Sequence, residues 1–414
     1  QTAGFSHSPT LPGASSETSA TRHEGSFADC KDTKIYCLRN FFCMFVAIMG
    51  KRLDSIDALR GFDMLFIMGL SSLIVTICGL FPGGQDFWIA RQMNHVEWNG
   101  LAHHDTIFPL FLFISGMTFP FSLAKKRAAK VHKGKIWLDI WRRALALVLL
   151  GLVYNGLFKL DFANLRFPSV LGRIGLAWLG AAIIWMTVKK TGWRVGIAAA
   201  LLIGYWVLHL FVAPDAPAGT DPCTKVGSLA CYIDRIIMPK HLLSKGVYDP
   251  EGLVSTLPAI VTAMLGMFTG SFVRKKEYSG GQKTIWMFIA AAVLLGLGLL
   301  WNTVFPINKK LWTSSFVLVV GAYSVAMFAL FYFIMDVLGW KKWAKPLKVV
   351  GLNSITIYMA QRIVSFGGIN NFFFKGLADL FPEPVGKVIL AATYILVCWL
   401  FLYFLYKKKI FLKV

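Results

Sequence analysis

The sequence predicts an all-α integral membrane protein, a polytopic bundle of about ten transmembrane helices. Of its 414 residues, 56% are hydrophobic and only 15% are charged, whereas soluble domains carry about a quarter charged residues. The chain also contains a series of apolar stretches of roughly 20 residues, the length that a helix needs to cross the hydrocarbon core. No stretch shows the alternating pattern of a membrane β-barrel strand.

The first 48 residues differ in composition from the rest of the chain. They are rich in Ser and Thr, then carry Cys30, Cys37 and Cys43, and they lack the basic, apolar and small-residue order of a signal peptide. Met49, just before the first apolar stretch, resembles a natural start. We therefore expect a flexible or non-native leader over 1–48 and a transmembrane domain over 49–414.

The apolar stretches give the helices in chain order, with boundaries that are soft by a few residues. The expected spans are 58–81, 106–124, 139–158, 170–188, 194–213, 254–273, 284–304, 315–338, 347–366 and 388–406.

The net charge of +22 is distributed unevenly between the connections. If all ten stretches cross the membrane, one side holds 25 Lys and Arg against three acids, Asp54, Asp139 and Glu277. These charges lie in 51–54, 125–143, 189–194, 274–283, 341–348 and 407–413. The other side holds 11 of each sign. This asymmetry follows the positive-inside rule and predicts cytoplasmic termini, with the loops 82–105 and 214–253 outside. Nucleic-acid binding is not expected, because these basic runs are short and each adjoins a span.

Several polar side chains fall inside or beside the spans, where ionisable groups are functional candidates. Asp57 and Arg60 lie one turn apart, so they can pair, or Arg60 can bind an anionic ligand from the cytoplasm. Arg173, and Arg362 in the ninth span, must face the bundle interior or a polar cavity, with salt bridges inside the bundle as the alternative. Asn353 and Ser354 place an amide and a hydroxyl inside a span, where hydrogen bonds between helices are the ordinary explanation.

The densest polar cluster covers 94–105, at the outer end of the second span. It contains His95, His103, His104 and two acids, Glu97 and Asp105. A neutral imidazole can accept a proton or attack a carbonyl, and a nearby carboxylate can fix its tautomer. Solvated loop histidines are the simpler alternative.

Cysteines and metal ligands are the remaining candidate site residues. Cys223 and Cys231 share an outside loop and can either form a small disulfide ring or remain free thiols. The chain has no CxxC pair and no HExxH motif, so we do not expect a metal site.

Several motifs, in the same order along the chain, resemble those of the heparan-α-glucosaminide N-acetyltransferase family. They are RLDSIDALRG at 52–61, HVEWNGL at 95–101, DTIFPLFLFISG at 105–116, PSVLGRIG at 168–175, YIDR at 232–235, YDPEG at 248–252, PINKKLW at 306–312 and GLNSI at 351–355.

The resemblance implies a transmembrane transfer of acetyl from cytoplasmic acetyl-CoA to the amine of a terminal glucosamine. Its active-site histidine matches His95, and Asp105 matches the aspartate before Phe-Pro, to which we give a supporting role. The nucleotide of acetyl-CoA would then lie at the basic face near Arg60 and 125–143, while the pantetheine arm reaches His95. The residues expected to bind acetyl-CoA are Arg60, Arg173, Asn353 and Ser354, and those expected to bind the sugar are Trp98, Asn99, Glu251, Asn308 and Lys309.

The sequence leaves the mechanism and two other functions open. His95 can act as a general base in a ternary complex or carry the acetyl group itself. The alternatives are an amino-sugar or oligosaccharide permease and an O-acetyltransferase of cell-envelope glycan. The chain lacks the long luminal N-terminal region of lysosomal members, which suggests a compact bacterial protein of the inner membrane with His95 toward the periplasm. Expected partners are acetyl-CoA, an amino-sugar or glycan acceptor and membrane lipid, and a homodimer is one arrangement such a bundle can form.

Overall fold

The computed structural model describes residues 53–243 and 246–412 of the chain. The chain divides into two units, 1–52 and 53–414. The leader predicted over 1–48 therefore lies outside the described residues, and the fold below is that of the second unit.

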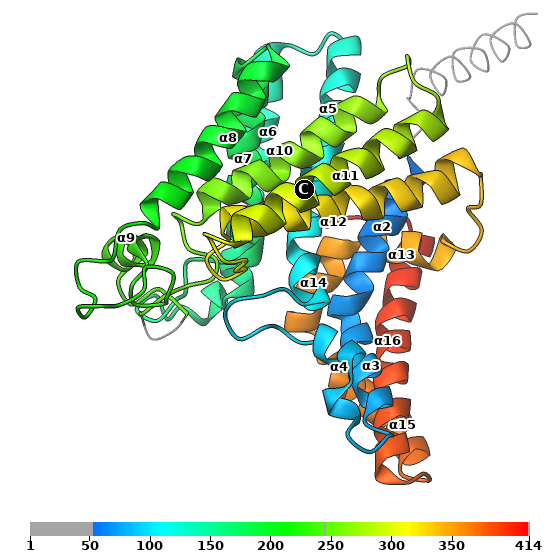
Figure 1. The fold of residues 1–414 in the computed structure, drawn as a ribbon. Coiled ribbons are helices and arrows are strands. Elements are labelled where there is room, and N and C mark those ends of the chain that lie inside the picture. The colour runs from blue at the N-terminus through cyan, green and yellow to red at the C-terminus, as the bar shows by residue number, and fades with distance from the viewer. Residues whose placement is uncertain (1–52, 244–245, 413–414) are drawn as a thin grey trace, which may run out of the picture. The chain divides into compact units, whose positions relative to one another are not determined.

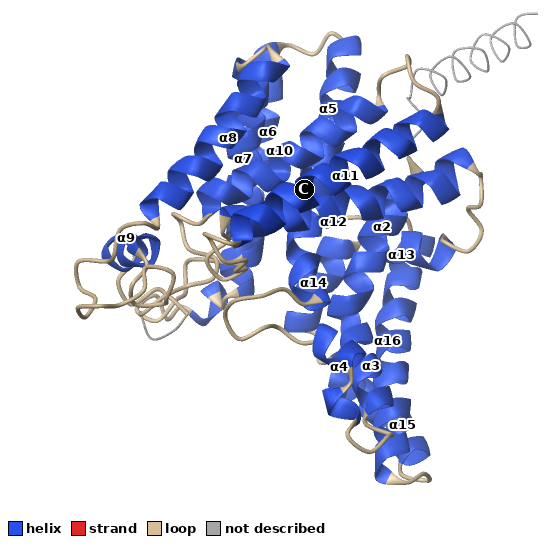
Figure 2. Ribbon diagram, viewed as in Figure 1, coloured by secondary structure: helices blue, strands red, loops and turns tan. Residues whose placement is uncertain are grey.

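Throughout 53–243 and 246–412 the ordered elements are helices joined by loops, and no strand is present (Figure 2). The α-helices are α2 (Asp54–Leu65), α3 (Ser71–Cys78), α4 (Trp88–Gln92), α5 (His103–Ala128), α6 (Lys133–Tyr154), α7 (Val170–Thr187), α8 (Thr191–Leu208), α9 (Leu229–Ile237), α10 (Thr256–Val273), α11 (Gly280–Asn302), α12 (Ser314–Tyr332), α13 (Lys345–Leu352), α14 (Ser354–Ile363), α15 (Phe366–Ala378) and α16 (Glu383–Lys407). Two 3₁₀ segments, η2 (Gly84–Asp86) and η3 (Leu157–Lys159), and two π segments, η1 (Phe66–Leu70) and η4 (Phe333–Val337), complete the element order.

The all-α membrane class is confirmed, with fewer qualifying spans than the ten expected. In the described part of the chain, eight helices are long and apolar enough to cross a membrane. They are Asp54–Cys78, His103–Ala128, Val170–Thr187, Thr191–Leu208, Thr256–Val273, Gly280–Asn302, Ser314–Val337 and Glu383–Lys407.

Two of the ten expected spans, 139–158 and 347–366, are not among these eight helices, each for its own reason. The stretch predicted at 139–158 begins earlier, as α6, and its first half carries Lys133, Lys135, Asp139, Arg142 and Arg143, which lower its mean hydropathy. The stretch predicted at 347–366 is not one helix but two, α13 and α14, separated at Asn353.

The break at Asn353 is held by polar contacts and by a close helix approach. The Asn353 amide donates to the Ile410 carbonyl at 3.2 Å. Just before it, α13 lies directly on α2, and a β-carbon at Gly351 would overlap the Asp57 carbonyl oxygen. Small residues at such crossings let two backbones approach closely in a membrane.

The first span also departs from a regular helix. Gly69, inside η1, has φ 133°, a conformation that side-chain-bearing residues rarely adopt. The span therefore changes direction between α2 and α3, and Ser71 follows the break as the first residue of α3.

The centre of the bundle is formed by α5 and α10, which lie side by side in Figure 1. Most residues of α5 and α10 are buried, whereas few residues of α8 and α16 are buried against the rest of the bundle. Exposed apolar helices match an outer, lipid-facing position, and the buried pair forms the core on which the site is built.

Candidate functional site

The polar cluster predicted at 94–105 lies where three segments meet. These are the loop 94–102, the first turn of α5 and the loop 303–313 before α12. His103, His104 and Asp105 belong to the helix and not to the loop. Asp105 is the third helical residue, and its carboxylate accepts from the backbone N–H of Ala102 at 3.2 Å, as acidic residues commonly do at helix N-termini.

His95 and Asp105 form a hydrogen-bonded pair. The distance between His95 Nδ1 and Asp105 Oδ1 is 2.6 Å. The Asp105 side chain is 2% exposed, while that of His95 is 51% exposed. The second carboxylate oxygen accepts from Val96 N–H at 3.3 Å as well as from Ala102. A buried carboxylate with fixed donors therefore orients an imidazole that reaches the surface.

This geometry defines the tautomer of His95. An ionised carboxylate only accepts hydrogen bonds, so Nδ1 must carry the proton that it donates to Asp105. In the neutral imidazole Nε2 then has a free lone pair, and within 53–243 and 246–412 it makes no hydrogen bond. The pair presents a basic, nucleophilic nitrogen at an open position.

Lys309, in the loop 303–313, contacts both members of the His95–Asp105 pair. Its Nζ lies 3.2 Å from Asp105 Oδ1 and 3.2 Å from His95 Nδ1. Because Nδ1 is already a donor, the ammonium donates to the carboxylate, which both groups share. Burial lowers the pKa of Lys309, and the nearby Asp105 carboxylate opposes this effect.

Asn99 and Asn308 tie the same two loops together. Asn308 Nδ2 donates to Asn99 Oδ1 at 3.0 Å, and Gly100 N–H donates to the Ile307 carbonyl at 2.8 Å. The side chain of Asn308 is almost fully buried, so its visible function is to fix the position of Lys309.

Trp98 lies beside this loop pair and contacts the loop 214–253. Its Nε1–H donates to the Cys223 carbonyl at 2.8 Å. Two ammonium groups, of Lys225 and Lys310, lie 5.4 and 5.8 Å from the centre of its ring. The edge of Tyr248 packs on the ring at 5.7 Å between centroids.

His103 and His104 belong to the polar cluster predicted from the sequence, but no role is assigned to them there. No sequence pattern indicates which residues they contact. The His104 ring lies 4.5 Å from that of His95, and its Nδ1 is 3.0 Å from Ser71 Oγ. His103 Nε2 is 3.1 Å from the Tyr323 hydroxyl. Ser71 and Tyr323 come from α3 and α12, so only the packing of these helices on α5 brings them to the site.

Glu251 lies in a second charged cluster. It forms an ion pair with Arg166, whose guanidinium also makes two hydrogen bonds to Asp249, at 2.6 and 2.7 Å. Although burial opposes the charge, the two carboxylates raise the pKa of Arg166 above its usual value. Glu251 is still close enough to Lys309 to favour its charge. The structure thus shows Glu251 ordering the outer loops, and sugar binding by it stays a prediction.

Arg173 lies on the same side as Lys309, away from the other residues expected to bind acetyl-CoA. Its guanidinium packs over the Trp312 ring at 4.9 Å and donates to the Gly252 carbonyl at 3.1 Å and to Ser255 Oγ. Among the described residues, its Nε and Nη1 have no hydrogen-bond partner although they are buried.

Arg60 belongs to α2, and Asn353 and Ser354 directly follow α13, the helix that packs on α2. Arg60 pairs with Asp57 at 3.7 Å, and Asn353 and Ser354 are both buried at the break after α13. The structure therefore divides the expected acetyl-CoA residues between two places, with Arg173 near the His95 side.

The remaining site predictions concern cysteines and metals. Cys223 and Cys231 are free thiols that contribute to one apolar cluster with Tyr248 and Leu311. Over 53–243 and 246–412, no group of three His, Cys, Asp or Glu side chains has an arrangement that could hold a metal ion.

Comparison with known proteins supports the resemblance drawn from the motifs. Heparan-alpha-glucosaminide N-acetyltransferase of Homo sapiens is 25% identical over 431 residues, which cover 89% of this chain and 61% of the human protein. The Mus musculus protein of the same name is 26% identical over 424 residues, covering 88% of this chain and 61% of its own length. The chain thus spans about three fifths of the length of these curated relatives. No protein-family model matches it.

Both alignments extend over most of the described bundle, including the segments that carry His95, Asp105 and Lys309. At this level of identity the matches support a family-level relationship between this membrane protein and the heparan-alpha-glucosaminide N-acetyltransferases.

Proposed function

We propose that this protein is a transmembrane acetyltransferase that moves acetyl from acetyl-CoA to the amine of a glucosamine-type sugar. The observation that carries the proposal is the His95–Asp105 pair, in which Nδ1–H is bound at 2.6 Å and Nε2 is open. The similarity to two N-acetyltransferases supports acetyl transfer to an amine as the reaction in which this pair takes part.

In the direct route, His95 acts as a general base. Nε2 removes a proton from the sugar amine while the nitrogen attacks the acetyl carbon, so that a C–N bond forms and the C–S bond to CoA breaks. The imidazolium that results is stabilised by the adjacent Asp105 carboxylate, and its proton passes to the CoA thiolate. Lys309 holds the carboxylate in place during these steps.

In the covalent route, Nε2 itself attacks the thioester, so the C–S bond breaks and CoA leaves as the thiolate. The sugar amine then attacks the acetyl carbon, the bond from this carbon to Nε2 breaks, and the amine proton passes to the thiolate. Both routes need the same tautomer of His95, so the geometry supports them equally. Rapid mixing of the protein with radioactive acetyl-CoA, without acceptor, separates them: protein-bound acetyl on a competent sample supports the covalent route, and its absence supports the direct one.

The direction of transfer follows from the charge asymmetry of the sequence. We place the basic connections on the cytoplasmic side and His95 on the outer side, which is periplasmic if the protein belongs to a bacterial inner membrane. Acetyl-CoA then enters from the cytoplasm, and the acceptor approaches the exposed edge of His95 from outside.

The test is turnover by the purified protein with acetyl-CoA and glucosamine, followed as free CoA and as acetylated sugar. We expect His95→Ala to lose at least about a hundredfold in rate, while Arg91→Ala, an exposed residue of the same outer loop, keeps the parent rate. Equal turnover in His95→Ala and the parent protein would refute the assigned site. Sugar uptake without acetylation would favour a permease, and an ester product would indicate an O-acetyltransferase.

A further inference from the structure

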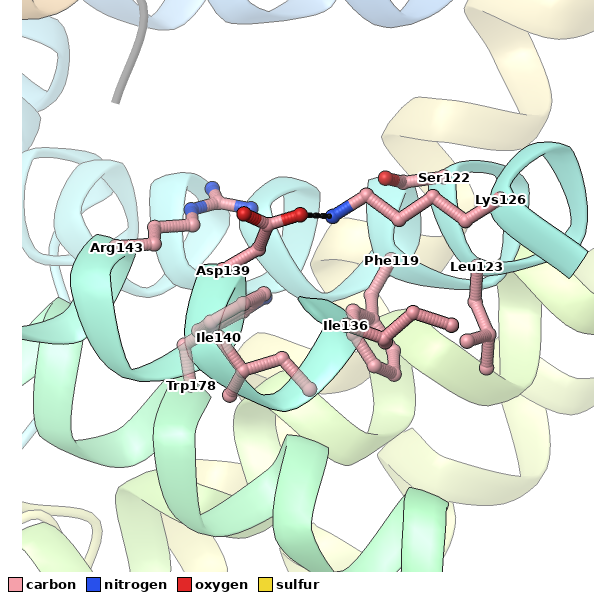
Figure 3. Close-up of a pocket in the computed structure, with 9 residues that line it drawn as sticks. All are labelled: Phe119, Ser122, Leu123, Lys126, Ile136, Asp139, Ile140, Arg143 and Trp178. Carbon is pink, nitrogen blue, oxygen red and sulfur yellow. Dashed lines mark hydrogen bonds and ion pairs between the residues drawn. The ribbon is translucent and has the colours of Figure 1, made fainter. Parts of the chain in front are cut away.

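A pocket opens between α5, α6 and α7, away from the His95 site. Its volume is about 240 Å³. Figure 3 shows an apolar side opposite a polar edge from which the charged side chains extend. The apolar side is formed by Phe119, Leu123, Ile136, Ile140 and Trp178, and the polar edge by Ser122, Lys126, Asp139 and Arg143.

Arg143 is the central polar group of this pocket. Its guanidinium stacks over the Trp178 ring at 4.3 Å, and Nη2 donates to Ser115 Oγ at 3.1 Å. Its Nε is buried and, within the described ranges, has no hydrogen-bond partner. A half-buried arginine whose buried Nε–H has no acceptor is incomplete as a structural group, because burial of an unpaired N–H is unfavourable.

A second arginine adds to the positive potential at this pocket. Arg60, on α2, is within electrostatic range of Arg143, and the two positive charges repel each other. The only acid of the 125–143 segment, Asp139, is bound by Lys126 at 2.7 Å, so it does not neutralise Arg143. Among the described residues no carboxylate forms an ion pair with Arg143, so its positive charge at the pocket favours an anionic ligand.

The distance between Arg143 and the His95–Asp105 pair can be estimated along α5. Its partner Ser115 lies ten residues after Asp105 on α5, which corresponds to roughly 15 Å along a helix. An extended pantetheine arm covers a distance of this order, so a phosphate at Arg143 and a thioester at His95 can belong to one molecule.

We propose that the pocket lined by Lys126, Asp139 and Arg143 is a phosphate-binding site, with Arg143 as its principal ligand. Guanidinium groups bind phosphate oxygens through two parallel N–H donors, and the apolar side accommodates an uncharged part of the same ligand. The phosphate comes from the nucleotide of the donor or from an anionic phospholipid headgroup. The first source rests on the proposed function, and the second does not.

The first experiment measures binding without turnover. The probe is 3′-phosphoadenosine 5′-diphosphate, the nucleotide part of CoA, titrated into the purified full chain in uncharged detergent. We expect Arg143→Gln to weaken binding about tenfold or more, and Arg143→Lys to weaken it less because the charge is kept. Arg142→Gln, which removes the same charge from the adjacent exposed position outside the pocket, is the matched control and should bind as the parent does.

Asp139→Asn gives a test in the opposite direction. It removes the negative charge from the pocket edge and frees Lys126, so the affinity for the nucleotide should increase by several-fold. A gain in affinity cannot arise from a misfolded protein, which makes this variant independent of any loss of stability in Arg143→Gln.

The second experiment distinguishes the source of the phosphate. Thermal unfolding is compared in nanodiscs of phosphatidylglycerol and of phosphatidylcholine, for the parent protein and for Arg143→Gln and Arg142→Gln. Stabilisation by phosphatidylglycerol that Arg143→Gln alone loses, with unchanged nucleotide binding, assigns the site to a lipid headgroup. If Arg143→Gln changes neither nucleotide binding nor lipid stabilisation, the phosphate site is wrong. If it weakens nucleotide binding in a protein that shows no acetyl transfer, the phosphate site stands and the proposed reaction fails.

Discussion

The carboxylate of Asp105 has four donors around it, and each oxygen has a separate set. Oδ1 receives His95 Nδ1–H and Lys309, and Oδ2 receives the backbone N–H groups of Val96 and Ala102. An amide cannot replace such a group, because one of its two ends is a donor. The residue therefore determines both the tautomer of His95 and the fold of the loop before α5.

Asp105→Asn should lower kcat/KM for acetyl transfer by about 10²- to 10⁴-fold, since the amide NH₂ would face either His95 or the backbone donors. Release of free CoA in the presence of glucosamine measures the loss. Asp86→Asn, in the same outer loop but highly exposed, is the control and should keep full activity. A parent rate in Asp105→Asn would mean that His95 is oriented by some other group.

The buried position of Lys309 leads to a prediction about the rate of acetyl transfer at high pH. Burial lowers its pKa below the usual value for lysine, so the ammonium loses its proton at a lower pH than a free lysine does. If its charge supports Asp105, activity falls as the pH rises through this lowered value. Lys309→Arg keeps the charge at all accessible pH, and its pH–rate profile should extend further into the alkaline range. Identical alkaline limits in the two proteins would exclude a role for the Lys309 charge.

At the scale of elements, the short helix α9 is joined to the loop before α10 by one buried carboxylate. Asp234 Oδ1 accepts from the N–H groups of Leu253 and Val254 at 3.0 and 3.2 Å. Burial raises its pKa to about 6, above its ordinary value of 3.8, against the lowering effect of these hydrogen bonds. The folded state therefore holds this proton more tightly than the unfolded state.

The resulting stability is fully present below pH 3.8 and is lost as the pH rises through about 6. Asp234→Asn keeps an acceptor for both N–H groups without a charge, so it should be more stable than the parent at pH 7.5, by about 3 kcal/mol at most. Thermal unfolding at pH 4.5, 6 and 7.5 should show the difference growing with pH. A difference that is constant across this range would contradict the assignment.

The contact between α2 and α13 makes a second prediction about elements. A β-carbon at Gly61 would overlap the Leu347 carbonyl oxygen, so the two helices would have to separate. We expect Gly61→Ala to destabilise the protein by about 1–3 kcal/mol, measured as a lower midpoint of thermal unfolding in detergent. Gly204→Ala, in α8 with open space around it, should be neutral or slightly stabilising. Equal effects of the two changes would argue against this packing.

For the whole molecule, the distribution of Lys and Arg between the connections predicts an orientation in the membrane, which no single helix indicates. The prediction is a cytoplasmic position for 125–143 and an outer position for 214–253. Ala129 and Ala218 are exposed residues in these two segments. On a background without other cysteines, a maleimide that cannot cross membranes should label Ala218→Cys in intact cells, and Ala129→Cys only after permeabilisation. The reverse pattern would invert the proposed direction of transfer.

The sequence by itself determined the class of this protein and pointed to the two residues of the proposed site. Apolar stretches of helical length predict membrane helices because lipid requires them, whatever their neighbours are. His95 and Asp105 are ten residues apart, so the pair is accessible to a local argument once the motif is recognised.

Only the tertiary structure decided which distant side chains join that pair and which expected spans are regular. Lys309 reaches Asp105 from the loop before α12, and Arg143 of α6 stacks over Trp178 of α7. The break at Asn353 follows from contacts with Ile410 and the close approach of α13 to α2. The composition and periodicity of a segment indicate whether it faces lipid or the protein interior. Contacts between segments depend on how the helices pack, and no local sequence pattern specifies this packing.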